Sequence, residues 1–505
     1  MSFPKLLLAF VVVAAQLTAA ELKIKVVDAA GEPVWARLEV RDAQGRMHQP
    51  LFALRDLDAR SRPGGGAWYL GSFVARGESV VEVPPGAYTI FAERGTEYER
   101  LQSHVDVNEG APSTVVLAPK PWIRMNQRGW WSADFHVHRQ PEDAEKLALA
   151  EDLNLSVVFT MWNQRDLFEG RELPENPVVK LDARHWMTVL NAEDERGGGA
   201  WMLHMIRERL GLGVEGRWFP PGIQFIKKAK KQRYVETGFP WFDCEKPFWW
   251  EVPVVMALSP PDSMGVLHNH FNQYGINDSE AWGRPRDKQK YPEAKGFVDA
   301  SLDLYYRYLN LGFRLPPSAG SASGVLPNPV GYNRVYVQLD EPFSVEAFYR
   351  NLRQGRSFVT NGPMLFFDSV ELPGGKIQLS VEAVSREPLD RIEIVANGKI
   401  IETFEAPPNK TEFQTTMEMQ EGLHTWVAAR CFTRNDATIR MAHSRPIYLR
   451  GRWNMHEDAM FFLRWIDQLI ELPRNEPNRQ STSEERRVLA GLYLQARRFY
   501  EEKAR

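Results

Sequence analysis

The sequence has 505 residues, 43% of them hydrophobic, which is enough to build two to four domains with cores of their own. The formal net charge is −3, and the basic cluster at 227–233 is best explained as a solvated helix face, so nucleic acid is not expected as a partner. Two cysteines, Cys244 and Cys431, exclude both a disulfide framework and a cysteine metal cluster, and whether they pair stays open.

Residues 1–20 have the features of a signal peptide. Lys5 is followed by an apolar run, Leu6–Ala15, and then by the small residues Thr18-Ala19-Ala20. We therefore predict a secreted or periplasmic protein whose mature chain begins at Glu21. An uncleaved anchor is the alternative, but about ten apolar residues is roughly half of what a spanning helix needs. No other segment is long and apolar enough to span a membrane, so none is expected after cleavage.

Residues 21–120 have the pattern of a small β-domain. Apolar and polar residues alternate over 22–46 around a turn, and again over 83–94, where Tyr88, Ile90 and Ala92 share one face. Short strands separated by Gly and Pro turns predict a β-sandwich similar to carboxypeptidase-regulatory-like modules. We expect it to pack against or present the rest of the chain.

Residues 121–363 alternate between strand and helix patterns. A strand at Ser132–His138, a helix from Pro141 to about Asp152 and a strand at Leu155–Thr160 form a β-α-β unit, which implies parallel strands. Further strands are predicted at Trp186–Ala192, Val252–Leu258, Val266–His270 and Arg334–Leu339, with helices near Gly296–Leu311 and Ser344–Gln354. This alternation favours an open α/β sheet or a barrel.

The end of the chain returns to strands and finishes in helices. Residues 364–450 hold alternating runs, including Lys376–Val384 and Arg391–Ala396, the latter followed by an Asn397-Gly398 hairpin signal. We predict a second β-sandwich there. Residues 451–505 carry apolar residues at helical spacing and predict two helices that cap the body.

Two His-x-His pairs, His136/His138 and His268/His270, stand out among only 11 histidines. On a strand, residues two apart share a face, so Asp134, His136 and His138 would project together. Neutral imidazoles suit zinc, manganese or iron. Buried structural histidines are the alternative for both pairs, and Asn269 suggests that the second pair lies in a loop.

The segment WSADFHVHR, followed by LALAEDLNLSVVFTMWN, resembles the opening of the PHP (polymerase and histidinol phosphatase) domain. Downstream, TVLNAED, a later histidine strand and GRSFVTNGP resemble the secreted branch that includes carbaryl-type hydrolases. The resemblance covers residues 121–450. It implies a distorted (β/α)7 barrel that binds up to three metals at the carboxyl ends of its strands.

Carried over residue by residue, this resemblance implies four metal ligands. His136 and His138 match the family's first pair, Glu193 matches the carboxylate that bridges metals, and His270 matches the later histidine.

Two ligand elements of the family are changed in this chain. The family's Thr-Asp-His-Asn reads Thr160-Met161-Trp162-Asn163, and Trp162 could fill the place of the missing ligand. The late Gly-Ser-Asp-x-His element aligns with 320–324, which has neither Asp nor His. The surviving set predicts one divalent ion rather than three.

These residues lead to two hypotheses. The first is a metal-dependent hydrolase that cleaves an ester or phosphoester in a small-molecule or glycan substrate. Asp134 would serve as a base or orient a histidine, or else merely cap local backbone, whereas Asp194 and Glu195 are expected to be solvated. The second is a non-catalytic protein that binds a glycan or a protein partner through an aromatic rim, because the chain has 16 tryptophans.

Overall fold

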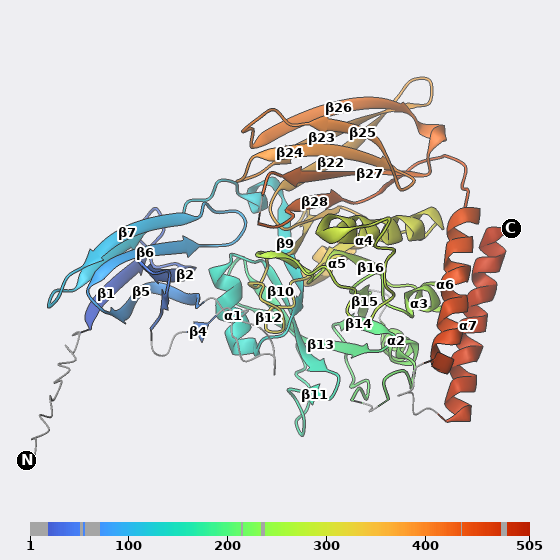
Figure 1. Ribbon diagram of the computed structural model, residues 1–505, viewed down its shortest axis with the longest axis horizontal. Helices are drawn as coiled ribbons and strands as arrows, with labels where there is room; N and C mark the ends of the chain where they lie inside the picture. Colours follow the sequence, from blue (N-terminus) through green and yellow to red (C-terminus); the bar gives the residue numbers. More distant parts are fainter. Residues whose placement is uncertain are drawn as a thin grey trace, which may run out of the picture.

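The computed structural model describes residues 19–50, 54–55, 71–213, 216–233, 238–435, 437–475 and 482–505. Apart from its last two residues, the predicted signal peptide lies outside the described residues. None of the helices in these ranges combines the length and the apolar character needed to cross a bilayer. An N-terminal sheet, a central α/β body, a layered β-region and a final helix pair follow one another along the chain (Figure 1).

The N-terminal strands form one curled sheet around a core of their own. Period-2 alternation buries Leu22, Ile24 and Val26 of the first strand. The sheet order is β7-β6-β2-β5-β1-β8, and β8 also lies close to β7. The strands are β1 (Ala20–Val26), β2 (Trp35–Asp42), β3 (Met47–His48), β4 (Leu54–Arg55), β5 (Phe73–Val83), β6 (Gly86–Glu93), β7 (Leu101–Val107) and β8 (Ser113–Leu117).

The central body is a mixed α/β structure whose sheet is nearly closed. Its strands run in the order β19-β16-β15-β14-β13-β10-β9-β20-β21, and β19 lies against β9 and β20 at the other end of this path. The strands are β9 (Trp130–Val137), β10 (Leu155–Trp162), β11 (Arg165–Asp166), β12 (Val178–Lys180), β13 (Trp186–Arg196), β14 (Gly199–His204), β15 (Trp241–Cys244), β16 (Ser263–Leu267), β17 (Phe271–Asn272), β18 (Gly275–Ile276), β19 (Pro317–Ala319), β20 (Arg334–Gln338) and β21 (Ser357–Thr360).

Parallel and antiparallel pairs are mixed in this sheet. The predicted β-α-β unit is present, since β9, β10 and β13 are parallel neighbours, but β13–β14, β14–β15 and β9–β20 are antiparallel. The exact (β/α)7 arrangement therefore stays a prediction. The helices of the body are η2 (Met125–Arg128), α1 (Pro141–Ala150), α2 (Gly222–Lys231), α3 (Val252–Leu258), α4 (Glu293–Asn310) and α5 (Val345–Arg353).

One predicted strand was wrong. Val252–Leu258 is the helix α3, not a strand. A run of seven apolar residues has the same pattern in a buried strand and in a buried helix, so periodicity could not separate them. Pro253 in the first turn was the available signal, because a helix tolerates proline there and a central strand does not.

The C-terminal strands form two facing layers. In one, β24, β25, β27, β28 and β29 continue the central sheet through the β21–β28 pair, and in the other β23 lies between β22 and β26. The Asn397-Gly398 turn joins β24 to β25, as predicted, with positive φ at both residues. The elements are β22 (Met364–Leu372), β23 (Lys376–Val384), β24 (Leu389–Ala396), β25 (Lys399–Glu405), β26 (Glu412–Gln420), η3 (Glu421–Leu423), β27 (Trp426–Thr433), β28 (Met441–Ser444) and β29 (Ile447–Tyr448).

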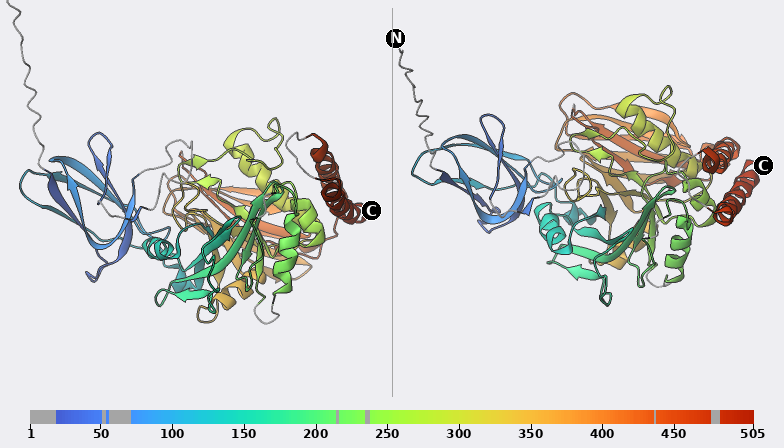
Figure 2. Two further views of the ribbon diagram at one scale, coloured as in Figure 1. Left: turned by 90° about the horizontal axis from the view of Figure 1, so that it is seen from below. Right: turned by 60° about the horizontal axis from the view of Figure 1, so that its bottom comes forward.

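The last two helices, α6 (His456–Asn475) and α7 (Ser483–Ala504), pack side by side against α3 (Figures 1 and 2). The Tyr493 hydroxyl donates to Glu251 Oε1 at 2.6 Å, and the Tyr500 hydroxyl donates to the Pro253 carbonyl at 2.9 Å. The pair therefore covers the body, as the sequence predicted.

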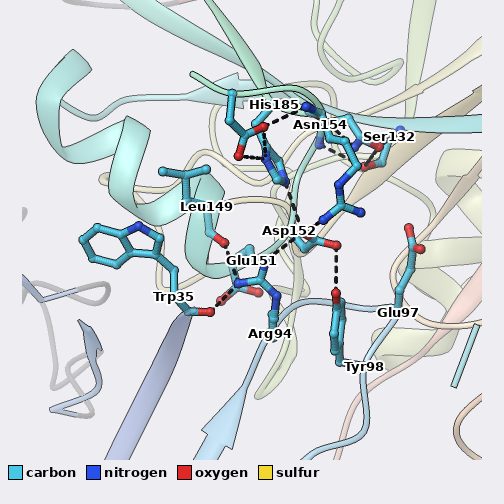
Figure 3. A network of polar contacts seen from close by, with 12 residues as sticks. Trp35, Arg94, Glu97, Tyr98, Ser132, Leu149, Glu151, Asp152, Asn154 and His185 are labelled. Carbon is cyan, nitrogen blue, oxygen red and sulfur yellow. Dashed lines mark hydrogen bonds and ion pairs between the residues drawn. The ribbon is translucent and has the colours of Figure 1, made fainter. Parts of the chain in front are cut away.

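The N-terminal sheet docks on the end of α1 through buried polar groups (Figure 3). Arg94 donates to Asp152 Oδ1 at 2.9 Å and to the Leu149 carbonyl at 3.1 Å, and Tyr98 donates to Asp152 Oδ2 at 3.3 Å. Burial raises the pKa of Asp152, but the hydrogen bond from His185 and the charge of Arg94 outweigh burial and hold this pKa well below its ordinary range. The sheet is thus held to the body by a carboxylate that stays ionised.

Both cysteines are buried as free thiols, Cys244 in β15 and Cys431 in β27. Burial raises the pKa of each thiol, that of Cys431 to about 12. Neither is therefore a reactive thiolate at neutral pH.

Candidate metal centre

The first His-x-His pair meets an acidic residue at one edge of the central sheet. His136 lies in β9 and His138 follows it, with their Nε2 atoms 2.8 Å apart. Glu193, from β13, places Oε2 at 2.9 Å from His138 Nε2 and 3.4 Å from His136 Nε2. The parallel strand β10 lies between β9 and β13, so these side chains meet at one edge of the sheet. All three side chains are buried.

The spacing of these three donor atoms fits a metal ion. Bonds of about 2.1 Å place neighbouring ligand atoms about 3.0 Å apart at right angles and about 3.4 Å apart in a tetrahedron. The three observed distances are 2.8, 2.9 and 3.4 Å. In addition, the buried Oε2 of Glu193 has no partner with hydrogen-bond geometry among the described residues. A cation would satisfy this oxygen.

Burial and the nearby carboxylates set the protonation of His136, His138 and Glu193. Burial disfavours a charged imidazole, but the charges of Glu193 and Glu245 raise the pKa of His136 to about 9. Burial, together with the charge of His136, lowers the pKa of His138, and the two imidazoles hold the pKa of Glu193 well below its ordinary range. In the metal-free protein His136 therefore carries a positive charge beside Glu193, and a metal ion would have to displace a proton to bind there.

Asp134 caps backbone groups and lies outside this group of donors. Its Oδ1 accepts from the amides of His136 and Ser321, both at 3.0 Å, and its Oδ2 accepts from the Gly331 amide at 2.7 Å. These contacts show that Asp134 caps backbone amides, which is one of the roles that the sequence suggested for it. The carboxylate joins β9 to the segments that support His136.

The second His-x-His pair does not join the first. The strand β16 ends at Leu267, so His268 and His270 follow it in a loop and lack the shared strand face. His268 Nε2 lies 3.3 Å from Ser301 Oγ, and the His270 ring stacks on Phe297 with centroids 5.7 Å apart. The group of converging donors found among the described residues does not include His270.

The Gly320–Gly324 segment, aligned above with the family's late ligand element, lies directly on the histidine strand. Ser323 accepts from the His138 amide at 2.8 Å, and a Cβ at Gly320 would lie 2.5 Å from the Cβ of His136. Only glycine fits so close an approach. The segment supports the pair without adding a histidine or a carboxylate.

Trp162 lies beside His138, and whether it fills the place of the family's missing ligand stays a prediction. Its ring centroid lies 4.5 Å from that of His138, and its Nε1 donates to Glu195 Oε2 at 3.0 Å. Burial and the charges of Glu193 and Glu245 raise the pKa of Glu195 to about 8. The expectation that Asp194 is solvated was wrong, because Asp194 is buried and pairs with Arg196.

Sequence reasoning missed Glu245 and Lys246, which directly follow β15. Glu245 Oε1 lies 3.5 Å from His136 Nδ1 and pairs with Lys246, while Glu245 Oε2 accepts from Trp249 Nε1 at 3.2 Å. A carboxylate behind a metal-binding imidazole fixes its tautomer and orientation. The available signal was the group Asp243, Glu245 and Lys246, charged residues set among the aromatic residues of 239–250.

Comparisons with known proteins give only weak similarities. No family model and no curated protein matches the sequence. A crystal structure of a two-domain protein from Bacteroides vulgatus, described as containing a predicted PHP-like metal-dependent phosphoesterase, is similar over 61% of this chain and 91% of its own, at 10% identity and a TM-score of 0.33. The Bacillus anthracis TIE protein is similar over 24% of this chain and 19% of its own, at 14% identity and a TM-score of 0.15. Similarities this low assign the chain to no family.

Proposed function

We propose that this chain is a PHP-like metal-dependent hydrolase that cleaves an ester or phosphoester with one divalent cation. The convergence of His136 Nε2, His138 Nε2 and Glu193 Oε2 carries the proposal, because it is a buried donor set with distances suited to coordination. The distorted (β/α)7 barrel and the carbaryl-type branch belong to the proposal and rest on the sequence motifs. Zinc, manganese and iron all suit two imidazoles and a carboxylate.

Each residue of the centre has a task in this proposal. His136, His138 and Glu193 would hold the ion, and a divalent cation supplies a Lewis acid that polarises an ester or phosphoryl group and makes water more acidic. Glu245 would orient the imidazole of His136 from behind, where its Oε1 lies 3.5 Å from Nδ1, a buried nitrogen with no hydrogen bond among the described residues. In the metal-free protein the pKa of Glu195 is raised to about 8, and this carboxyl, which accepts from Trp162 Nε1, would be the proton donor to a leaving group.

The test combines metal content with hydrolysis. The protein is purified without chelator and incubated separately with zinc, manganese and iron(II), and its metal content is then measured by mass spectrometry. We expect one ion per chain and turnover of a chromogenic aryl ester or aryl phosphodiester. In His136→Ala both should be lost, whereas His104→Ala, an exposed histidine of β7, should retain both. Equal metal and stability in native, chelated and His136→Ala protein would falsify the proposal.

A second candidate function, ring binding without catalysis, rests on Trp282. This side chain is 39% exposed, stacks on the buried Trp249 with centroids 5.0 Å apart, and donates from Nε1 to the Arg196 carbonyl at 3.0 Å. A tryptophan fixed with one face outward is a surface on which a sugar ring can stack. Titration of tryptophan fluorescence with a panel of soluble oligosaccharides tests this function. Saturable binding that is lost in Trp282→Ala and kept in His136→Ala would favour it.

We also propose that the protein is exported. The apolar run Leu6–Ala15 and the small residues before Glu21 support a cleaved signal peptide. Expression in a bacterial host and N-terminal sequencing of the periplasmic fraction should give a chain that begins at Glu21. Retention of Met1 in the mature protein would contradict export by this route.

A further inference from the structure

A buried lysine lies on the far side of His136 from the three donor atoms. Lys246 is 2% exposed, and its ammonium pairs with Glu245 Oε1. The same oxygen lies 3.5 Å from His136 Nδ1, whereas His136 Nε2 faces His138 and Glu193. The imidazole of His136 therefore separates the metal donors at one nitrogen from a buried ion pair at the other.

Both oxygens of Glu245 are engaged by groups of the protein itself. Lys246 and the ring nitrogen of His136 lie at Oε1, and Trp249 Nε1 donates to Oε2 at 3.2 Å. The Lys246 ammonium also lies 4.8 Å from the centroid of the Trp249 ring, where the face of an indole attracts a cation. The charge of Glu245 is thus balanced by Lys246, and its second oxygen accepts from Trp249.

The lysine matters because this edge of the sheet gathers carboxylates. Glu193 and Glu195 share a face of β13, and Glu245, 3% exposed, comes from the end of β15. Glu193 faces the two imidazoles and Glu195 holds a proton, whereas Glu245 is paired with Lys246. A charged carboxylate buried without such a partner is very unfavourable. A second metal ion could provide that charge, and here an ammonium group of the chain already provides it.

We propose that Lys246 takes the place of a second metal ion, so that the centre holds one ion and no more. This inference rests on the proposed function for the first ion. The Lys246 ammonium neutralises Glu245, whose Oε1 lies 3.5 Å from His136 Nδ1. A neutral side chain of similar length at position 246 would leave Glu245 buried without its cation, and a divalent ion would then bind there.

Ion counting tests the proposal. Native protein, Lys246→Met and Lys246→Arg are equilibrated with excess Mn²⁺ and freed of loose metal, and manganese per chain is measured by mass spectrometry. We expect Lys246→Met to gain one ion relative to the native protein and Lys246→Arg to gain none. The double variant Glu245→Gln/Lys246→Met should lose the extra ion. Lys228→Met, which removes a lysine of α2 distant in sequence from this group, is the matched control and should gain none.

A second measurement keeps the test decisive if Lys246→Met is too unstable for ion counting. Electron paramagnetic resonance should show a second Mn²⁺ environment in Lys246→Met, and Mn²⁺ should raise the melting temperature of the variant more than that of the native protein. One ion in both proteins overturns this inference and leaves the proposed function standing. No ion in either overturns both. Two ions in the native protein overturn the inference alone.

Discussion

The two His-x-His pairs of this chain have the same spacing but opposite surroundings. His136 and His138 lie at the end of β9, where β13 supplies Glu193. His268 and His270 follow β16 in a loop, against aromatic rings and a serine hydroxyl. The spacing alone therefore does not make a metal site. A neighbouring strand must also bring a carboxylate to the same edge.

The first histidines of the two pairs, His136 and His268, also differ in their electrostatics. The pKa of His136 is raised to about 9, since the charges of Glu193 and Glu245 outweigh burial. Burial and the neighbouring His270 lower the pKa of His268 well below its ordinary value. A site suited to a cation holds a proton in the absence of metal, whereas a histidine packed for structure stays neutral.

Loss of the first pair should have the largest effect. His136→Ala and His138→Ala each remove a donor, so metal affinity should fall by more than the roughly 10–100-fold that changes behind the ligands usually cost. His268→Ala should leave affinity unchanged. Competition with a fluorescent chelator measures all three variants. Equal losses in the two pairs would show that the second pair also binds metal.

The second effect is a pH dependence that only the first pair should show. Because the pKa of His136 is raised above its ordinary 6.5, its stabilising contribution is complete below about pH 6.5 and is lost as the pH rises to about 9. In metal-free protein this loss should reach about 3 kcal/mol of unfolding free energy. His136→Gln should remove this part of the slope and leave the part that Glu195 contributes up to about pH 8, and His268→Gln should keep the native slope.

Urea unfolding in the presence of a chelator at pH 6.5, 8 and 9.5 measures this dependence. The His268 variant is the control, because a histidine with a lowered pKa contributes equally at every pH above 6.5. Parallel curves for native protein and His136→Gln across the window would show that His136 is neutral in the folded state.

The sequence predicted the first pair and its strand well, because alternation on β9 fixes which residues share a face. It placed Glu193 through the resemblance to a family, since no local pattern shows that β13 lies two strands from β9. Glu245 and Lys246 escaped notice because their role depends on the packing of β15 beside β14 and β16. Long-range strand order is the information that one sequence lacks.

The third effect concerns the support beneath the first pair. A methyl group at Gly320 would lie 2.5 Å from His136 Cβ, so Gly320→Ala should cost about 1–3 kcal/mol of stability through overpacking. The displaced imidazole should also bind metal several-fold more weakly. Gly422→Ala is the matched control, because a Cβ there meets no atom within 4 Å. Chemical unfolding and metal titration of both variants measure these two effects.

The smallest effect should come from His270, whose ring stacks on Phe297. His270→Ala removes this aromatic contact and should cost about 1 kcal/mol of unfolding free energy. Metal content should not change, because His270 lies outside the group of converging donors. The variant thus separates packing from coordination at the residue that the resemblance proposed as a fourth ligand. If His270→Ala lost metal as His136→Ala does, both pairs would bind the ion. The two pairs would then differ only in the metal-free protein.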